Sequence, residues 1–213
     1  MNRSVRLVVA LLGAVAVYFT LVAIVFAPVD KQGARVVHLT ERSEAVGRTL
    51  GVNVLLPAKS GSPGQRSLLL FLHGRGGSEE TFTGNEAVYE GLAKLGARAP
   101  VVAFPDGGDH SYWHNRDSGR WDRYLMREVI PRLIGRFDVD PERIAVGGIS
   151  MGGFGAYNLA LHHPARFCAV GGHSAALWFT AGETAPGAFD DAADFNRNDV
   201  VGEVRRRSDP FAG

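Results

Sequence analysis

Gly148-Ile149-Ser150-Met151-Gly152 is the segment of the sequence best suited to covalent chemistry. It matches the G-x-S-x-G pattern, in which a serine sits on a sharp turn between a strand and a helix with its hydroxyl exposed. Gly148 and Gly152 would let the strand and the helix pack closely, because glycine has no Cβ. An apolar stretch precedes the pattern and a helical stretch follows it, so we predict that Ser150 is a nucleophile. The alternative is a glycine-rich helix start at which Ser150 only caps the helix.

A second glycine-rich segment, Leu-His-Gly-Arg-Gly-Gly at residues 72–77, follows another apolar stretch. Acyl transfer needs two backbone N–H donors for the oxyanion, one after the nucleophile and one from an earlier strand-end loop. We predict that Met151 supplies the first donor and that Arg75, or else Gly74, supplies the second. A phosphate-binding loop is the alternative, but its Gly-x-x-x-x-Gly-Lys-Ser/Thr pattern is absent from the sequence, as is the dinucleotide fingerprint. His73 is expected to hold this loop in place rather than to act as a general base.

Residues 104–121 form a long aromatic and polar segment after a third apolar stretch, where they could line the same site. His110 and His114, together with Asp106 or Asp109, are residue types that bind metals. Their spacing does not match the zinc sites that are carried on helices. We therefore predict a packed or substrate-lining loop, with no metal ion and no cofactor.

The elements around these segments alternate between strand and helix. Apolar runs, alternating or continuous, predict strands at residues 35–42, 48–56, 67–72, 101–104, 143–146 and 167–170. Helical spacing predicts helices at residues 86–95, 121–137 and 153–161, the second with an apolar residue at every fourth position. This alternation predicts an α/β sandwich whose mostly parallel sheet is covered on both faces. In such sheets, ligands bind at the carboxyl ends of the strands.

The composition excludes several other classes of protein. The 213 residues include 23 Lys and Arg against 22 Asp and Glu, a balance that argues against a nucleic-acid-binding protein. Hydrophobic residues make up 46% of the chain and charged residues 21%, which excludes an intrinsically disordered chain. The single cysteine, Cys168, excludes a disulfide framework and a cysteine-rich zinc module. The sequence does not indicate an oligomeric state.

Residues 7–27 are uncharged and almost entirely apolar, and as a helix they would span about 31 Å. Arg3 and Arg6 precede them, as in a signal sequence. The run is longer than the apolar region of a cleavable signal peptide, so we predict an uncleaved transmembrane signal anchor. The chain then divides into a cytoplasmic tail, anchor and linker at residues 1–33 and an extracytoplasmic globular domain at residues 34–213. Secretion after signal cleavage is the alternative.

Four motifs follow one another along the chain: residues 72–77, Phe-Pro-Asp-Gly-Gly at 104–108, the helix predicted from Trp121 to Pro131 with Glu128, and Gly-Ile-Ser-Met-Gly-Gly-Phe-Gly-Ala-Tyr at 148–157. These motifs and their order along the chain resemble those of the esterase D-like branch of the α/β-hydrolases. That branch includes S-formylglutathione hydrolases, feruloyl esterases and mycolyltransferases. The resemblance implies a three-layer α/β-hydrolase sandwich and a carboxylesterase-type serine hydrolase. Ser150 would form the acyl-serine, with Arg75 and Met151 as oxyanion donors. The substrate would be a small-molecule, lipid or sugar acyl ester, or a thioester. An acyltransferase of mycolyltransferase type is the alternative.

One part of the family pattern is missing from the sequence. In this fold the triad acid follows the nucleophile along the chain, and the histidine follows the acid. No acidic residue lies between Ser150 and His173, and no histidine follows His173. His162 and His163 fall at the end of the helix after Ser150, and His173 is expected to be a surface histidine. We therefore expect the triad acid and histidine to be absent from this chain, as in a family member truncated at its C-terminal end. A catalytically defective module with the hydrolase fold is the third hypothesis.

Overall fold

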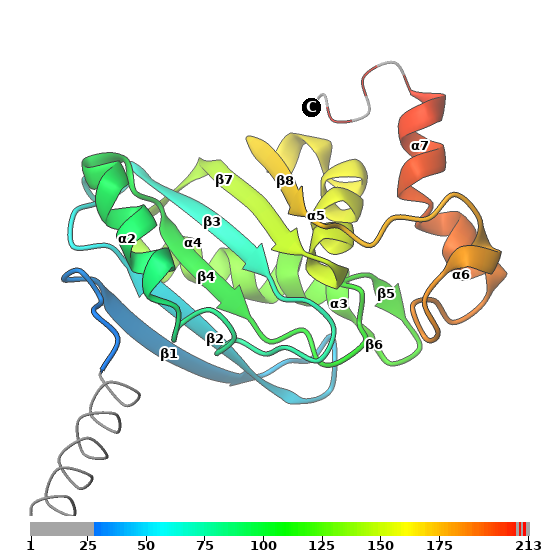
Figure 1. Cartoon of the computed structure of the whole chain (residues 1–213), viewed down its shortest axis with the longest axis horizontal. Helices are drawn as coiled ribbons and strands as arrows, with labels where there is room; N and C mark the ends of the chain where they lie inside the picture. Colours follow the sequence, from blue (N-terminus) through cyan, green and yellow to red (C-terminus); the bar gives the residue numbers. More distant parts are fainter. Residues whose placement is uncertain (1–27, 208, 210, 212–213) are drawn as a thin grey trace, which may run out of the picture. The chain divides into compact units, whose positions relative to one another are not determined.

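The centre of the fold is a mixed β-sheet in which six described strands are hydrogen-bonded in the order β1-β2-β4-β3-β7-β8 (Figure 1). The computed structural model describes residues 28–207, 209 and 211. The strands of the sheet are β1 (Arg35–Arg42), β2 (Thr49–Leu56), β3 (Arg66–Leu72), β4 (Val101–Pro105), β7 (Val139–Ile149) and β8 (Ala169–His173). A separate short hairpin is made by β5 (Asn115–Arg116) and β6 (Gly119–Arg120).

The strands that carry the candidate site run parallel and end together. β4, β3, β7 and β8 are parallel to one another, whereas β1 and β2 are antiparallel to their neighbours. Leu72 of β3 pairs with Gly148 of β7, and Ile149 of β7 pairs with His173 of β8. The loop after Leu72, the turn at Ser150 and the segment after His173 therefore meet at one edge of the sheet. The predicted α/β fold with a mostly parallel sheet is confirmed.

The helices lie in layers on the two faces of the sheet, with α2 on one face and α3, α4 and α5 on the other (Figure 1). The α-helices are α2 (Glu86–Leu95), α3 (Trp121–Arg123), α4 (Ile130–Phe137), α5 (Met151–His162), α6 (Ala192–Arg197) and α7 (Val200–Arg206). A π-helix, η2 (Tyr124–Val129), joins α3 to α4, and the short 3-10 turns are η1 (Gly96–Arg98), η3 (Pro164–Arg166) and η4 (Ala181–Glu183).

The main core lies between the sheet and the layer of α4 and α5. Leu68, Leu70 and Leu72 of β3 have no exposed surface and belong to this core. Burial of each such side chain contributes about 1.5–3 kcal/mol. The intervening residues of β3, Leu69 and Phe71, point to the opposite face, because successive side chains of a strand alternate.

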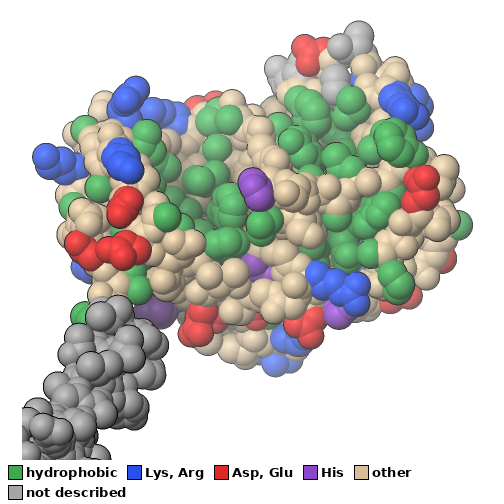
Figure 2. Space-filling model, viewed as in Figure 1, with side chains coloured by type: hydrophobic (Ala, Val, Ile, Leu, Met, Phe, Trp, Pro, Cys, Tyr) green, Lys and Arg blue, Asp and Glu red, His purple; other side chains and the backbone are tan. Residues whose placement is uncertain are grey.

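The opposite face of the sheet carries an apolar groove beside α2. Its lining includes Leu69, Phe71, Phe82, Val88, Leu92, Val102 and Phe104. Phe71 packs edge-on against Phe82, with 5.0 Å between ring centroids. Figure 2 shows hydrophobic side chains gathered on this side of the molecule. The expectation that helices cover both faces therefore holds fully on the α4–α5 side, whereas α2 covers only part of the other face within the described residues.

The helix predicted over residues 121–137 is present but is divided by the π-helix η2. An apolar residue at every fourth position advances about 40° per step on an α-helix, or about 160° between Trp121 and Phe137. The wider π turn, in which the Ile130 N–H donates to the Leu125 carbonyl, reduces this drift. Trp121, Leu125, Val129, Leu133 and Phe137 are all buried as a result.

The predicted transmembrane segment, residues 7–27, lies outside the described residues. Within the part of the chain that is described, no helix combines the length and the apolar character needed to cross a membrane. The signal anchor stays a prediction.

Replacement of Tyr124 by Phe is expected to stabilise the protein. Tyr124 is 4% exposed, and no partner for its hydroxyl is found among the described residues. Burial raises the pKa of this phenol well above its ordinary value. A buried hydroxyl without a partner costs about 1–3 kcal/mol, so Tyr124→Phe should raise the melting temperature in calorimetry by about 2–4 °C for each kcal/mol recovered. The control, Tyr89→Phe, should lower it, because the Tyr89 hydroxyl donates to the Thr83 carbonyl at 2.6 Å. A lower melting temperature for Tyr124→Phe would mean that its hydroxyl has a partner, such as a buried water.

Candidate active site

Ser150 lies on a strained turn between β7, which ends at Ile149, and α5, which begins at Met151. Its backbone has φ 54° and ψ −114°, a conformation that residues with a side chain rarely adopt. The residue is exposed, and no hydrogen bond to its hydroxyl is found among the described residues. Strain of this kind is common at functional sites. The strand–turn–helix context that the G-x-S-x-G pattern requires is therefore present, and the nucleophilic role of Ser150 stays a prediction.

The two glycines of the pattern allow the backbones around Ser150 to approach closely. A Cβ atom on Gly152 would lie 2.0 Å from the Leu72 carbonyl oxygen, and one on Gly148 would lie 2.4 Å from the Gly152 carbonyl carbon. Real Cβ atoms essentially never make contacts this short, and the obstructing atoms are backbone atoms that cannot swing away. Any side chain at Gly148 or Gly152 would therefore separate the start of α5 from β7 and from the end of β3.

The loop after β3 lies directly against the turn that carries Ser150. A Cβ atom on Gly74 would be 3.5 Å from the Ser150 Cβ. Within the described residues, the backbone N–H groups of Arg75 and Met151 donate hydrogen bonds to no other protein group. Neither N–H group therefore has a protein acceptor among these residues, as the predicted role of oxyanion donor requires. The Met151 N–H also belongs to the first turn of a helix of 12 residues, where the partial positive charge of the helix dipole is concentrated.

His73 holds this loop as a buried, neutral imidazole, as the sequence predicts. Its Nδ1–H donates to the Gly74 carbonyl at 2.8 Å, and its Nε2 accepts from the Gly107 N–H at 2.9 Å, a tautomer assigned from these partners. Burial lowers the pKa of His73, although the Gly74 carbonyl and the charge of Asp106 act in the opposite direction. The C=O and N–H of one peptide point in opposite directions. By holding the Gly74 carbonyl, His73 therefore turns the Arg75 N–H away from itself and fixes its direction.

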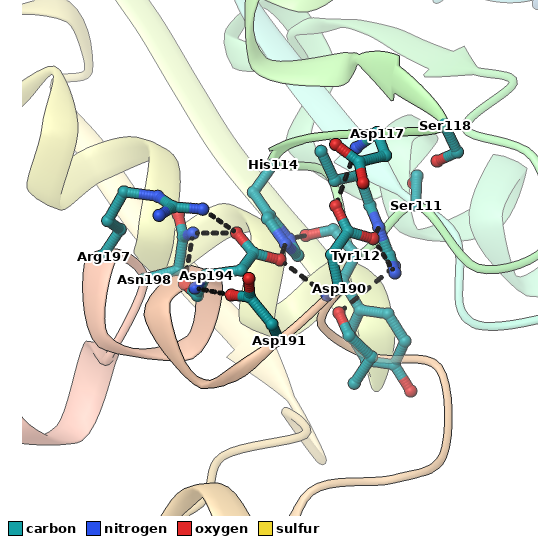
Figure 3. Close-up of polar contacts among 12 residues, drawn as sticks. Ser111, Tyr112, His114, Asp117, Ser118, Asp190, Asp191, Asp194, Arg197 and Asn198 are labelled. Atoms are coloured by element: carbon teal, nitrogen blue, oxygen red, sulfur yellow. Dashed lines mark hydrogen bonds and ion pairs between the residues drawn. The ribbon is translucent and has the colours of Figure 1, made fainter.

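His114 is the second buried histidine, and its partner is one that the sequence does not suggest. Its Nε2 lies 3.0 Å from Asp194 Oδ2, across 80 residues of sequence, and the two side chains are 1% and 0% exposed (Figure 3). Its Nδ1 faces the Tyr112 carbonyl at 3.4 Å. Both ring nitrogens therefore face oxygen atoms of other residues, and neither is hydrogen-bonded to Ser150.

Asp194 is ionised at neutral pH because several donors surround it. Burial acts to raise the pKa of this carboxyl, but the hydrogen bonds from His114 and from the Asp190 N–H outweigh it, and the net direction is downward. Asp194 Oδ1 also accepts from the Asn198 side chain at 3.0 Å and from Arg197 at 3.4 Å (Figure 3). The pair of His114 and Asp194 is a structural anchor that joins the loop after β4 to α6.

A second set of contacts joins residues 186–190 to the loop after β4. The Arg116 guanidinium donates to the His110 and Gly187 carbonyls at 2.6 and 2.8 Å and to Asp190 Oδ1 at 2.8 Å. Asp190 Oδ2 accepts from the Asp117 N–H at 2.7 Å. The predicted packed loop is therefore present. Among the described residues, no group of three or more His, Cys, Asp or Glu side chains is arranged to hold a metal ion.

No imidazole of the chain hydrogen-bonds to Ser150, and all seven histidines of the sequence are described. His163 pairs with Asp122 at 2.9 Å, and His162 lies about 18 Å from Ser150 along α5. His173 is exposed at the end of β8, and its carbonyl accepts the Ser150 N–H at 3.0 Å. No hydrogen bond to the ring nitrogens of His173 is found among the described residues, and its backbone is hydrogen-bonded directly to the turn that carries Ser150.

A family model described as "Putative esterase" matches residues 43–211. The chain belongs to this esterase family. A relative named as an esterase, from Mycobacterium tuberculosis, is 30% identical over 141 residues, which are 62% of this chain and 30% of the relative. A diacylglycerol acyltransferase/mycolyltransferase from Mycobacterium leprae is 29% identical and matches 81% of this chain and 54% of its own length. This esterase-family chain thus spans about a third to a half of the length of these relatives.

Solved structures show the fold of this esterase-family chain to be that of the α/β-hydrolases. A ferulic acid esterase superimposes with a TM-score of 0.69 at 22% identity, covering 84% of this chain and 74% of the other. An S-formylglutathione hydrolase from Agrobacterium tumefaciens superimposes with a TM-score of 0.58 at 19% identity, covering 85% and 69%. At this level of identity the likeness concerns the fold. The resemblance drawn from the four sequence motifs is confirmed.

The stability that His73 contributes is expected to depend on pH. Its pKa is lower in the folded chain than the ordinary 6.5, so the folded state binds fewer protons than the unfolded state. The contribution should be complete above pH 6.5 and should be lost as the pH falls through the folded-state pKa. The free energy of unfolding, measured with urea, should therefore differ between wild type and His73→Gln most at pH 7.5 and progressively less below 6.5. His162→Gln, at an exposed position, is the control. Parallel pH curves for wild type and His73→Gln would contradict this expectation.

Loss of Asp194 is expected to destabilise the fold strongly. Asp194→Ala removes a buried carboxylate that accepts hydrogen bonds from His114, the Asp190 N–H and the Asn198 side chain. A buried donor left without its partner costs about 1–3 kcal/mol, so the free energy of unfolding should fall by about 3 kcal/mol or more. Asp191→Ala is the control on the same helix, because Asp191 only caps α6 through the Asp194 N–H, and caps contribute about 1 kcal/mol. The losses from His114→Ala and Asp194→Ala should not add in the double variant. Additive losses would show that the two side chains act independently.

Proposed function

We propose that the chain cleaves carboxyl esters or thioesters through an acyl-serine at Ser150. The observation that carries this proposal is the placement of an exposed serine on a left-handed turn at the start of α5, with two unoccupied backbone N–H groups beside it. Membership of the esterase family supports the same reaction class.

Each candidate residue then has a defined part in the reaction. The Ser150 Oγ attacks the carbonyl carbon of the substrate, and its proton passes to a base. The N–H groups of Arg75 and Met151 bind the oxygen that becomes negative in the tetrahedral intermediate. Collapse of this intermediate breaks the bond to the leaving alcohol or thiol, which takes up the proton. Water then attacks the acyl-serine, releases the acid and restores Ser150.

The reaction also needs a general base, and no histidine ring of the described chain is hydrogen-bonded to Ser150. His73 and His114 are buried with their ring nitrogens directed at other protein atoms, and neither ring is hydrogen-bonded to Ser150. A serine hydroxyl is a weak nucleophile without such a base. We therefore expect this chain, expressed alone, to be a slow hydrolase. Oxyanion donors and substrate binding alone give about 10³–10⁴-fold acceleration over water.

Transfer of the acyl group to an alcohol is the second candidate function. The relatives named as acyltransferases and mycolyltransferases support it. The same acyl-serine would form, and a hydroxyl of a sugar or lipid would replace water as the attacking group. The two functions differ only in the acceptor, so one assay can separate them.

Labelling by an activated phosphonate is expected to identify Ser150. Wild type should take up one phosphonate group, detected by mass spectrometry, and Ser150→Ala should take up none. Ser62→Ala, an exposed serine on the turn before β3, should behave like wild type. Turnover of a short-chain activated ester should be slow and should fall to the buffer rate in Ser150→Ala. Acyl transfer would be shown by a new ester when a sugar alcohol is added.

Two outcomes would contradict these expectations. Labelling that persists in Ser150→Ala would remove Ser150 as the nucleophile. Rapid turnover that Ser150→Ala abolishes would show that a histidine of this chain does act as the base, and His173→Ala and His110→Ala would identify which one.

A further inference from the structure

Trp113 is completely buried beneath the loop that carries Arg75. Its indole Nε1–H donates to the His73 carbonyl at 3.2 Å. Its ring also meets the His73 imidazole edge-on, with 5.1 Å between centroids and 68° between the planes. One side chain thus holds both the backbone and the ring of the residue that directs the Arg75 N–H.

The same indole is wedged against the helix that begins beside Ser150. A Cβ atom on Gly155 of α5 would lie 2.5 Å from the Trp113 Cβ. On the far side of the ring, a Cβ atom on Gly107 would lie 2.4 Å from the indole Cη2 and Cζ2. The ring therefore fills the space between α5 and the loop after β4 with no room to move, and two glycines make that fit possible.

The backbone at Trp113 is strained to bring the ring to this place. Tyr112 and Trp113 have φ values of 49° and 60°, which lie in the left-handed region. The Trp113 N–H donates to the Ser111 hydroxyl, itself buried, at 3.1 Å. Two consecutive left-handed residues with large side chains are costly, and such strain persists only where the surrounding structure enforces it.

We propose that Trp113 is a positioning residue for the reaction at Ser150. Through His73 it fixes the peptide that carries the Arg75 N–H, and through Gly155 it contacts the helix that carries the Met151 N–H. The two oxyanion donors are thereby held at one fixed separation. This inference rests on the proposed function. Trp113 acts through its neighbours and has no contact with the reacting atoms.

The test compares two Trp→Phe variants. Trp113→Phe keeps an aromatic ring but removes the N–H that holds the His73 carbonyl. Trp121→Phe is the matched control, since Trp121 is 2% exposed and its Nε1–H donates to Ser118 Oγ at 3.4 Å and not to the loop after β3. The rate constant for phosphonate labelling of Ser150 should fall about 10- to 100-fold in Trp113→Phe, the range expected when a catalytic group is misplaced by less than about 1 Å. For the activated ester, kcat should fall by the same factor with KM unchanged. In Trp121→Phe both rates should stay within twofold of wild type.

If Trp113→Phe does not fold, 3-benzothienylalanine inserted at position 113 replaces the indole N–H by sulfur with little change of shape, and the same loss of labelling rate is expected. A labelling rate within twofold of Trp121→Phe in the folded variant would overturn the role of Trp113 and leave the proposed function intact. Labelling that survives Ser150→Ala would overturn the proposed function itself, whatever the Trp113 variants show.

Discussion

Direct contact between two backbones, with no side chain in between, is the constraint on which the candidate site depends. The start of α5 lies against the end of β3 so closely that a Cβ on Gly152 would touch both the Leu72 and the His73 carbonyl oxygens, at 2.0 and 2.7 Å. Because β3 and α5 meet in this way, the loop after β3 and the first N–H groups of the helix fall beside Ser150. Ser150 and the proposed oxyanion donors are therefore placed by packing of the main chain, and the side chains around them keep that packing rigid.

The histidines show how environment assigns roles to one residue type. His73 and His114 are the two that lie near the site and are buried, and each has both ring nitrogens occupied by protein atoms. Each of these imidazoles connects two separate parts of the protein through its ring nitrogens, and neither ring is hydrogen-bonded to Ser150. His173 differs from these two histidines because it is exposed. The buried imidazoles thus serve as structural connectors, whereas Ser150 is exposed.

The parts of the structure that could be predicted are those encoded by local patterns. The strands and helices follow from apolar runs and spacing, and the turn at Ser150 follows from glycines two residues on either side of it. The π-helix η2 could have been anticipated from the strict four-residue spacing after Trp121, which an α-helix does not match. The pairing of His114 with Asp194 could not, because it joins residues 80 positions apart and nothing local to either one signals the other. The function of Trp113 is hidden for the same reason. Its three contacts lie after β3, on α5 and after β4, and only the folded chain brings them together.

The strain at Ser150 raises the question of what keeps the turn from relaxing, and the hydrogen bonds of its own backbone answer it. The Ser150 N–H donates to the His173 carbonyl at 3.0 Å, and the Ser150 carbonyl accepts from the N–H groups of Ala176 and Phe154, both at 3.0 Å. The turn is thus clamped by the end of β8 on one side and packed against β3 on the other. A relaxed φ at Ser150 would break the bonds to His173 and Ala176, and each broken bond would leave a backbone group without that partner, at about 1–3 kcal/mol if the group is shielded from water. Strain at a single residue costs about 1–3 kcal/mol. Two such bonds together match or exceed the strain of one residue, and Ser150 stays exposed at the turn.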